Sequence, residues 1–293
     1  MPELTPWRPA IISDSTYIWR KMGLAAMHDE EPVLLQSSNR GVISLRLNRP
    51  GKFNTLSREL LTALQNALET VASDPNARCL VISGAGKAFC AGHDLGEMRR
   101  SNGPDECRSL FSQCSTFMQS IVTLPIPVIA RVHGIATAAG CQLVASCDLA
   151  IAGNSARFAV SGINLGLFCS TPAVALSRNV SAKNAFDMLV TGDFIDAETA
   201  VAYGLINQAV DDNALDEAIA AKVESILAKD PKAVRYGKAM FSAQRSLPLA
   251  DAYALAGNVM ARNMMEPDTG EAIDAFLEKR PAKLAFRDLA TSK

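Results

Sequence analysis

Short apolar segments alternate with amphipathic stretches through the first half of this 293-residue chain, and this alternation constrains the fold most strongly. Residues 33–47 show the period-two pattern of strands, and residues 37–41 have turn chemistry, which predicts a β-hairpin. Ser57 then precedes leucines at helical spacing and is expected to cap a helix. Further strands are expected at 79–83, 127–132 and 148–152, with helices at 105–122 and 141–147. The pattern predicts an α/β core.

The later sequence is helical in character. Asp196 is expected to cap a short helix that Gly204 closes, and helices are predicted at 214–229, 231–245, 249–265 and 269–279. We therefore expect an N-terminal arm over residues 1–32, a core over 33–200, a helical region over 201–283 and a tail over 284–293.

Composition excludes several classes of function. Lysine plus arginine number 29 and aspartate plus glutamate 30, so the net charge of −1 leaves no excess positive charge for a nucleic acid. The most apolar region, residues 121–153, is interrupted by prolines and charges, so no membrane span is expected. The seven cysteines include no C-x-x-C pair, and there are only three histidines, which argues against a metal site or a disulfide framework. Unpaired cysteines and the lack of a recognisable targeting signal predict a cytoplasmic location.

Two stretches of small residues, 84–95 and 133–140, each follow an expected strand and enter a helix or turn. Backbone N–H groups at such junctions have no intrahelical partner, and the helix dipole there favours negative charge. One N–H from each stretch would form an oxyanion hole for a carbonyl group. Close packing alone would also explain the small residues.

The motifs in these stretches are recognisable. FCAGHDLGEM (89–98) and HGIATAAGCQLVASCDLAIA (133–152) resemble the two signatures of the enoyl-CoA hydratase/isomerase family, the crotonase superfamily. NRPGKFNTLS (48–57), VTGDFIDAETAVAYGLINQAV (190–210) and AFLEKR (275–280) resemble further segments of that family in the same order, and GLFCSTPAVALSR (166–178) is similar to one of its subgroups. The resemblance implies an α/β crotonase (ClpP-like) fold, a spiral of ββα units with a C-terminal helical trimerisation region.

The resemblance also implies a function in fatty acyl-CoA metabolism. Family members bind acyl-CoA thioesters and stabilise a thioester enolate between two backbone N–H groups, which the motif match assigns to His93 and Ala139. No metal and no permanently bound cofactor is implied, since the coenzyme A thioester is the substrate, and the implied assembly is a homotrimer or a dimer of trimers. The implied substrate-binding positions are Lys52, Phe53, Ala91, Gly92, His93, Asp94, Leu95, Ala138, Ala139, Gly140, and Phe276 and Lys279 from a neighbouring subunit.

The sequence departs from the family at the two glutamates that hydratases use as general acid and base. Gln142 stands at the first position and Gly162 at the second, in a segment where the family has a pattern like F-A-x-P-E. A neutral amide does not take a proton from water at pH 7. Each general acid or base typically contributes 10²–10⁴-fold, so hydratase activity is doubtful.

Three alternatives remain open. The chain is an acyl-CoA enzyme with weak or altered activity, a non-catalytic acyl-CoA-binding protein, or a crotonase-type thioester hydrolase. Cys169, Ser170 and His93, the last paired with Asp94, are candidate groups for an altered reaction. Simpler readings are a buried small side chain for Cys169, core packing for Phe276, and solvated charges for the two lysines. Glu97 and Glu106 are expected to be helix surface charges.

Overall fold

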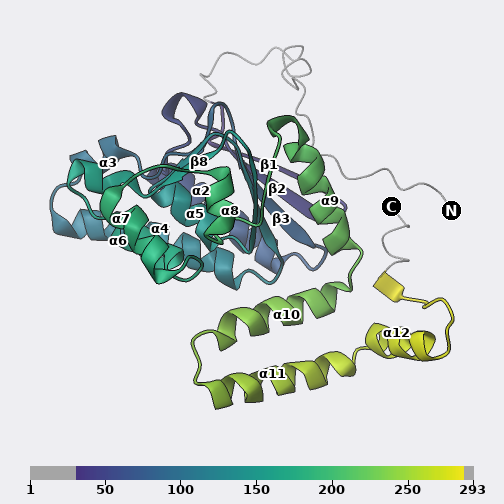
Figure 1. Ribbon diagram of the computed structural model, residues 1–293. Coiled ribbons are helices and arrows are strands. Elements are labelled where there is room, and N and C mark those ends of the chain that lie inside the picture. The colour runs from purple at the N-terminus through teal and green to yellow at the C-terminus, as the bar shows by residue number, and fades with distance from the viewer. Residues whose placement is uncertain (1–30, 287–293) are drawn as a thin grey trace, which may run out of the picture.

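Two β-sheets form the centre of the molecule in the computed structural model, which describes residues 31–286 (Figure 1). The larger sheet has the strand order β1-β2-β3-β5-β7-β10, and the smaller has the order β4-β6-β8-β9. The strands of the larger sheet are β1 (Leu34–Asn39), β2 (Val42–Leu47), β3 (Cys79–Gly84), β5 (Val128–Val132), β7 (Leu149–Gly153) and β10 (Gln208–Val210). Those of the smaller sheet are β4 (Ala88–Cys90), β6 (Ile135–Thr137), β8 (Arg157–Ala159) and β9 (Ile195–Asp196).

The predicted hairpin and the helix after it are confirmed. Strands β1 and β2 pair antiparallel around a turn at Arg40 and Gly41, and β2 then pairs parallel with β3. The helix α2 (Arg58–Ser73) begins where Ser57 accepts a hydrogen bond from the Leu60 amide, and its leucine face is buried. Because β2, β3, β5 and β7 run parallel, their connecting segments must cross over, and helices supply these crossovers.

Helices surround the sheets and continue beyond them. Those of the core are α2, α3 (Leu95–Arg100), α4 (Pro104–Thr123), α5 (Ala139–Ser146), α6 (Ser170–Leu176), α7 (Ala182–Thr191), α8 (Ala197–Ala202) and α9 (Leu215–Leu227). Short 3₁₀ turns lie at Pro50–Lys52, Ser161–Leu165 and Asp212–Ala214. One large apolar cluster contains the side chains of α2, α4 and α5, including Leu64, Phe117 and Leu143. A second packs α9 against the opposite face of the larger sheet.

Each of the two stretches of small residues contains a short strand that the sequence pattern did not predict. Strand β4 lies within residues 84–95 and β6 within residues 133–140, and the two strands pair parallel in the smaller sheet. Each strand has only three residues, too short for a periodic pattern to show in the sequence. This pairing holds the two candidate oxyanion stretches side by side.

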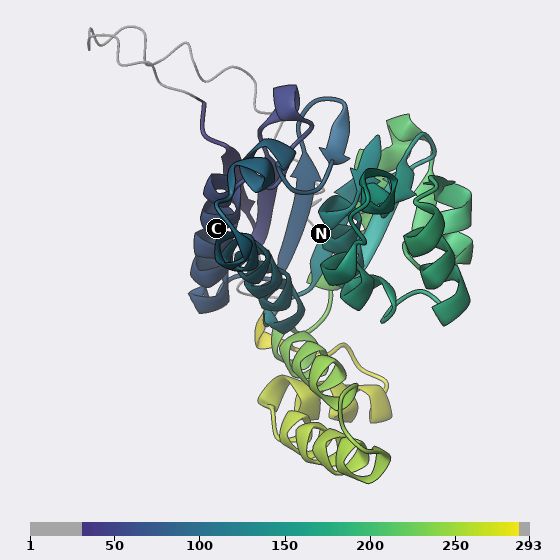
Figure 2. The same cartoon turned by 90° about the vertical axis from the view of Figure 1, so that its left-hand side faces the viewer.

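The helices α10 (Pro231–Gln244), α11 (Leu249–Met264) and α12 (Pro267–Leu277) form an arm that stands away from the sheets (Figure 1, Figure 2). The Lys238 side chain ties α10 to the core. Its ammonium donates to the carbonyl oxygens of Ile121 and Ile126 at 3.0 and 2.8 Å, and it pairs with Asp148 at 2.6 Å. Asp148 also accepts a hydrogen bond from the Val128 amide at 2.7 Å.

The predicted boundary at residue 200 requires correction. Strand β10 pairs with β7 in the larger sheet, and α9 packs against that sheet, so the core extends to about residue 227.

The predicted N-terminal segment over residues 1–32 lies almost wholly outside the described residues, as does most of the predicted tail over residues 284–293. Within residues 31–286, no helix is both long and apolar enough to cross a bilayer. All seven cysteines are free thiols.

Candidate active site

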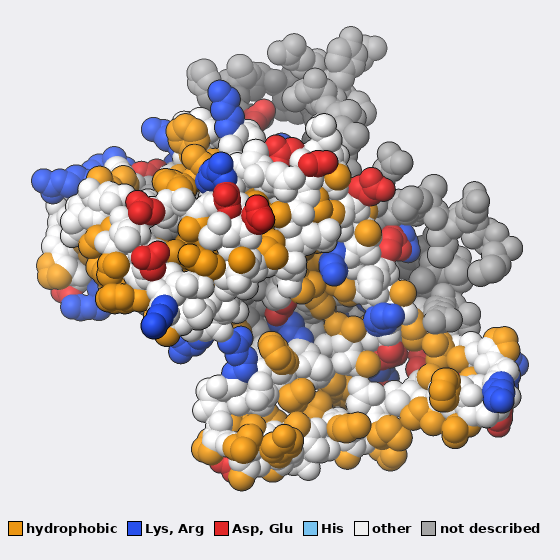
Figure 3. All heavy atoms as spheres, viewed as in Figure 1, with side chains coloured by type: hydrophobic (Ala, Val, Ile, Leu, Met, Phe, Trp, Pro, Cys, Tyr) orange, Lys and Arg blue, Asp and Glu red, His pale blue; other side chains and the backbone are white. Residues whose placement is uncertain are grey.

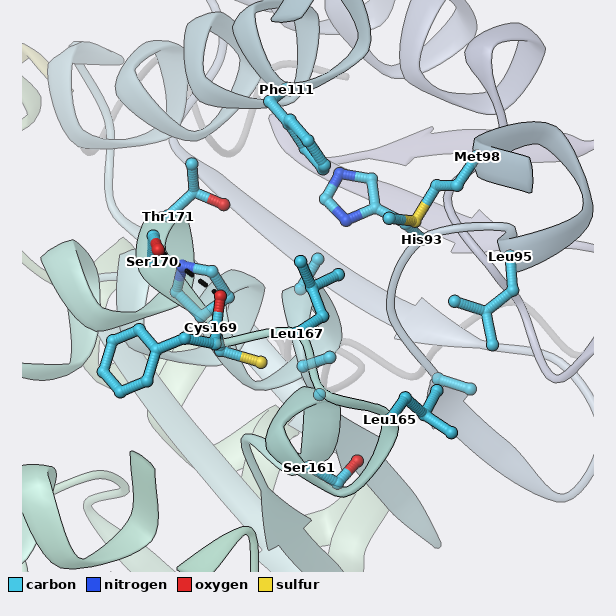
Figure 4. A pocket seen from close by; sticks show the side chains of 16 residues that line it. His93, Leu95, Met98, Phe111, Ser161, Leu165, Leu167, Cys169, Ser170 and Thr171 are labelled. Atoms are coloured by element: carbon cyan, nitrogen blue, oxygen red, sulfur yellow. Dashed lines mark hydrogen bonds between the residues drawn. The ribbon is translucent and has the colours of Figure 1, made fainter. Parts of the chain in front are cut away.

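A cavity of about 300 Å³ opens where α3, α4, α5 and α6 meet the smaller sheet (Figure 4). Most of its wall is apolar. The lining residues are Ala91, His93, Leu95, Met98, Phe111, Ala138, Ala139, Ser161, Gly162, Leu165, Leu167, Phe168, Cys169, Ser170, Thr171 and Pro172. It contains no carboxylate or ammonium group, so a charged group entering it would meet no opposite charge from these residues.

The His93 amide is free to bind a ligand because of how its neighbours pair. Leu56 forms an isolated parallel bridge with His93, in which the Leu56 amide donates to the Gly92 carbonyl and the Asp94 amide donates to the Leu56 carbonyl. This pattern pairs the Gly92 carbonyl and the Asp94 amide with Leu56. The His93 N–H, which lies between these two groups, therefore points away from Leu56. Within the described residues this amide donates no hydrogen bond.

The Ala139 amide is free for a different reason. Ala139 is the first residue of α5, where an N–H has no intrahelical acceptor, and it donates no hydrogen bond within residues 31–286. The two stretches touch here, since a Cβ on Gly92 would lie 2.9 Å from the Ala138 Cβ and 3.2 Å from the Ala139 nitrogen. Gly140 in turn packs against the Cys90 carbonyl. The two free amides therefore lie at one junction beside the cavity.

Ala138 holds this junction in a strained conformation. Its φ of 50° and ψ of −120° lie in a region that favours glycine, at a cost on the order of 1–3 kcal/mol. The Ala138 amide donates to the Ala159 carbonyl at 3.0 Å, which fixes the turn to β8. Backbone strain of this kind persists where the surrounding structure enforces it. Here the strained turn directs the N-terminus of α5 toward the cavity.

Asn54 holds the first stretch in place, and the sequence analysis did not identify it. Its buried side-chain amide donates to the carbonyls of Ala85 and Ala88 at 2.8 and 2.7 Å, and its oxygen accepts from the Arg49 amide. The Phe53 carbonyl accepts from the Ala91 amide at 3.0 Å. The exposed Lys52 and Phe53 side chains therefore lie on a turn attached to the stretch 84–95.

Asp94 has a structural role that separates it from His93. Its carboxylate pairs with Arg49 at 3.1 Å and accepts hydrogen bonds from the amides of Gly96 and Glu97, capping α3. These hydrogen bonds and the Arg49 charge, acting against partial burial, hold the pKa of Asp94 below its usual range. The hypothesis of a His93–Asp94 pair is therefore wrong. Leu95 follows as an exposed residue on the cavity rim.

A side chain at residue 162 would require its neighbours to move. A Cβ on Gly162 would lie 2.6 Å from the Leu167 carbonyl oxygen and 2.8 Å from the Cys169 sulfur. Gln142, at the other glutamate position, is only 5% exposed, and its Oε1 is enclosed without a hydrogen-bond partner. It does not line the cavity. Neither position can deliver a carboxylate to the cavity in this arrangement.

The remaining candidate groups differ in their ability to react. Burial lowers the pKa of His93 to about 4, so its imidazole is neutral at pH 7. Burial also raises the pKa of the Cys169 thiol, which keeps it protonated and weakly nucleophilic. The Ser170 hydroxyl donates to the Phe168 carbonyl at 3.3 Å and contacts no base among the described residues. Cys169 is 7% exposed, which fits its simpler reading as a buried small side chain.

The cavity lining contains no side chain from four other candidate residues, which are Glu97, Glu106, Phe276 and Lys279. Glu97 accepts a hydrogen bond from the Arg58 amide and Glu106 one from the Asn102 amide, so neither carboxylate turns toward it. Phe276 lies in the last turn of α12, and Lys279 lies two residues beyond the end of that helix. Phe276 is 81% exposed, so core packing within this chain is excluded for it.

Comparison with known proteins shows the family and the fold of the chain. The family model described as enoyl-CoA hydratase/isomerase matches residues 37–287. The mitochondrial enoyl-CoA hydratase domain-containing protein 3 of Danio rerio is 40% identical over 263 residues, covering 90% of this chain and 91% of that protein. A crystal structure of an enoyl-CoA hydratase from Mycobacterium smegmatis has 56% identity and a TM-score of 0.85, covering 86% of this chain and 99% of the other.

The solved structure of human enoyl-CoA hydratase domain-containing protein 3 is 40% identical, with a TM-score of 0.83, and covers 86% of this chain and 99% of that one. The predicted fold and subgroup similarity are thereby confirmed. The chain belongs to the enoyl-CoA hydratase/isomerase family.

Proposed function

We propose that this protein binds an acyl-CoA thioester with its carbonyl oxygen between the N–H groups of His93 and Ala139, and stabilises the enolate of that thioester. The observation that carries the proposal is the meeting of two unused backbone amides beside one apolar cavity. The oxygen gains full negative charge only in the enolate, so preorganised donors favour reaction over simple binding. The family's CoA-thioester chemistry supports the same assignment.

Hydration of 2-enoyl thioesters is expected to be weak or absent. That reaction needs groups that activate water, and none of the cavity-lining residues carries a carboxylate. Relatives named as hydratases include the enoyl-CoA hydratase of Mycobacterium smegmatis, 56% identical, and the crotonyl-CoA hydratase of Syntrophomonas wolfei, 31% identical to this chain, so the expectation rests on the cavity lining and not on the relatives' names. A purely binding role remains the main alternative. Thioester hydrolysis through Cys169 is disfavoured, because the raised pKa of the thiol leaves little thiolate.

The CoA portion is proposed to lie along Lys52 and Phe53, over the stretch from Ala91 to Leu95.

The arm formed by α10, α11 and α12 carries exposed apolar side chains (Figure 3). Among them are Leu249, Tyr253 and Met260, each more than 70% exposed. Such surfaces mark interaction sites. A homotrimer, or a dimer of trimers, would cover these apolar side chains and bring Phe276 and Lys279 to a neighbour's cavity.

A cytoplasmic location stays a prediction, and vertebrate relatives are named as mitochondrial proteins.

Acetoacetyl-CoA tests the oxyanion hole directly, because its enolate absorbs in the near ultraviolet. Wild-type protein should bind it and increase the enolate absorbance. The matched variants are Ala138→Gly, which relaxes the turn, and Ala138→Gly combined with Ala139→Pro. Proline is tolerated at a first helical position, where its ring carbon replaces the N–H hydrogen, and glycine at residue 138 accommodates the restriction that proline puts on the residue before it. We expect the double variant to lose about 10²–10³-fold in enolate stabilisation relative to Ala138→Gly. Equal absorbance in both would refute the proposed site.

A second experiment separates the reactions. Crotonyl-CoA and longer 2-enoyl-CoAs are incubated with the protein, and products are identified by mass spectrometry. Rapid gain of one water would refute the loss of hydratase activity, and release of free CoA would support hydrolysis. Retention of intact thioester would support binding without hydration.

A further inference from the structure

The His93 side chain lies in the cavity wall and has no hydrogen-bond partner among residues 31–286. Its imidazole is directed into the cavity beside Phe111, with ring centroids 5.5 Å apart and planes at 84° (Figure 4). Nε2 is enclosed, and Nδ1 is the ring nitrogen left on the cavity side. Such a T-shaped contact fixes the orientation of the ring. A neutral imidazole has one nitrogen that donates and one that accepts, so it can take up one proton.

No other lining group is suited to accept a proton. Cys169 is the only other titratable side chain among the lining residues, and its thiol stays protonated. The Ser161 hydroxyl shares a hydrogen bond with Thr137 at 2.8 Å. The Asp94 carboxylate is engaged by Arg49 and by the first turn of α3. His93 is the remaining candidate base.

We propose that the His93 imidazole is the base that removes a proton from the α-carbon of the bound thioester, an inference that rests on the proposed function. The α-carbon C–H bond breaks and an N–H bond forms at Nδ1. The electron pair moves into a carbon–carbon double bond, and the thioester oxygen becomes the anion held by the His93 and Ala139 amides. Return of a proton to the same carbon exchanges hydrogen with solvent. When the substrate is a 3-enoyl thioester, delivery of the proton to C4 instead gives the 2-enoyl isomer. Neither outcome takes up water.

The acid–base properties of the site support this assignment. The pKa of His93, lowered to about 4 by burial, is close to that of an ordinary glutamate at ~4.3. The neutral imidazole is therefore about as strong a base as the carboxylates missing at residues 142 and 162. Proton transfer creates an imidazolium next to the enolate, and this pair of opposite charges favours the intermediate in an apolar cavity.

The test is hydrogen exchange of butyryl-CoA in D₂O, with deuterium at the α-carbon measured by mass spectrometry. His93→Gln keeps the backbone amide and a polar side chain without a base. His93→Phe keeps an aromatic ring beside Phe111. Both should lower the exchange rate about 10²–10⁴-fold, while butyryl-CoA affinity changes by less than about threefold. Cys107→Ala, at a thiol outside the cavity lining, is the matched control and should exchange at the wild-type rate. Cys169→Ala tests the other titratable group of the lining. Circular dichroism establishes that each variant is folded.

The outcomes separate the two proposals. Binding of butyryl-CoA by wild-type protein without α-exchange would overturn the assignment of His93 and leave the proposed oxyanion site in place. Wild-type exchange rates in either folded His93 variant would overturn it as well. Loss of exchange in Cys169→Ala would transfer the role to the thiol. A wild-type protein that binds no acyl-CoA would overturn the proposed function and this inference together.

Discussion

Removing the Lys238 ammonium should weaken the attachment of the helical arm to the core, although the hydrogen bonds of Arg235 and Ser242 remain. The side chain of Lys238 is 7% exposed and pairs with Asp148, whose side chain is 28% exposed. Lys238→Met keeps much of the apolar stem but leaves the carboxylate with only the Val128 amide as a partner among the described residues. It also leaves the carbonyls of Ile121 and Ile126 without their charged donor.

The magnitude follows from the burial of this pair. Breaking a fully buried ion pair costs about 3–5 kcal/mol, because the remaining charge is uncompensated. Asp148 keeps some contact with water, so we expect the lower end, about 3 kcal/mol of unfolding free energy. Asp148→Asn retains the acceptor for the Val128 amide and should cost less, about 2 kcal/mol. The double variant should be more stable than the sum of the two changes predicts, by at least about 1 kcal/mol.

Urea denaturation of the four proteins, at one protein concentration, gives this double-mutant cycle. Fixed concentration matters because assembly would add to the apparent stability. A loss below about 1 kcal/mol for Lys238→Met, or strict additivity of the two changes, would refute the view that a coupled buried pair anchors α10.

Three further predictions concern the cavity. Burial holds the pKa of His93 near 4, below the ordinary value of 6.5, so the unfolded chain binds a proton first as pH falls. Urea denaturation should therefore show wild-type stability falling by about 2 kcal/mol more than that of His93→Gln between pH 7.5 and 5, and equal losses would contradict the buried neutral ring. Ala138→Gly should raise the melting temperature, because relief of strain at φ 50° outweighs the roughly 0.5–1 kcal/mol entropic cost of glycine; a lower value would argue against strain. Introducing glutamate at both Gln142 and Gly162 should not restore rapid crotonyl-CoA hydration, followed by loss of enoyl absorbance, because a Cβ on residue 162 meets the Cys169 sulfur at 2.8 Å. Rapid hydration would show that this contact yields easily.

Much of the core could be predicted from local pattern. The hairpin β1–β2, the helix capped by Ser57 and the strands β3, β5 and β7 follow from periodicity and capping residues that act within a few positions. The later helices were also predicted within a few residues of their observed ends. The short strands β4, β6, β8 and β9 were missed, because they form only through pairing with one another.

The site required the tertiary structure. The motifs predicted the two oxyanion residues and the two glutamate replacements, and they assigned Lys52 and Phe53 to the CoA site; these assignments stay predictions. The sequence did not reveal Asn54, whose side-chain hydrogen bonds reach residues more than 30 positions away. It also paired Asp94 with His93, although the Arg49 guanidinium, 45 positions earlier, engages that carboxylate instead.

The sequence by itself therefore determined the α/β core and the family, and it predicted the replacement of two carboxylates, because these depend on residue identity and short-range spacing. Only the tertiary structure decided which groups face the cavity. Orientation, burial and the pKa of His93 arise from packing between α3, α4 and the smaller sheet, which are distant in the chain. The close approach of the Cys169 sulfur to Gly162 is likewise a property of the folded chain, and it is the reason why we expect no hydration when glutamate is introduced there.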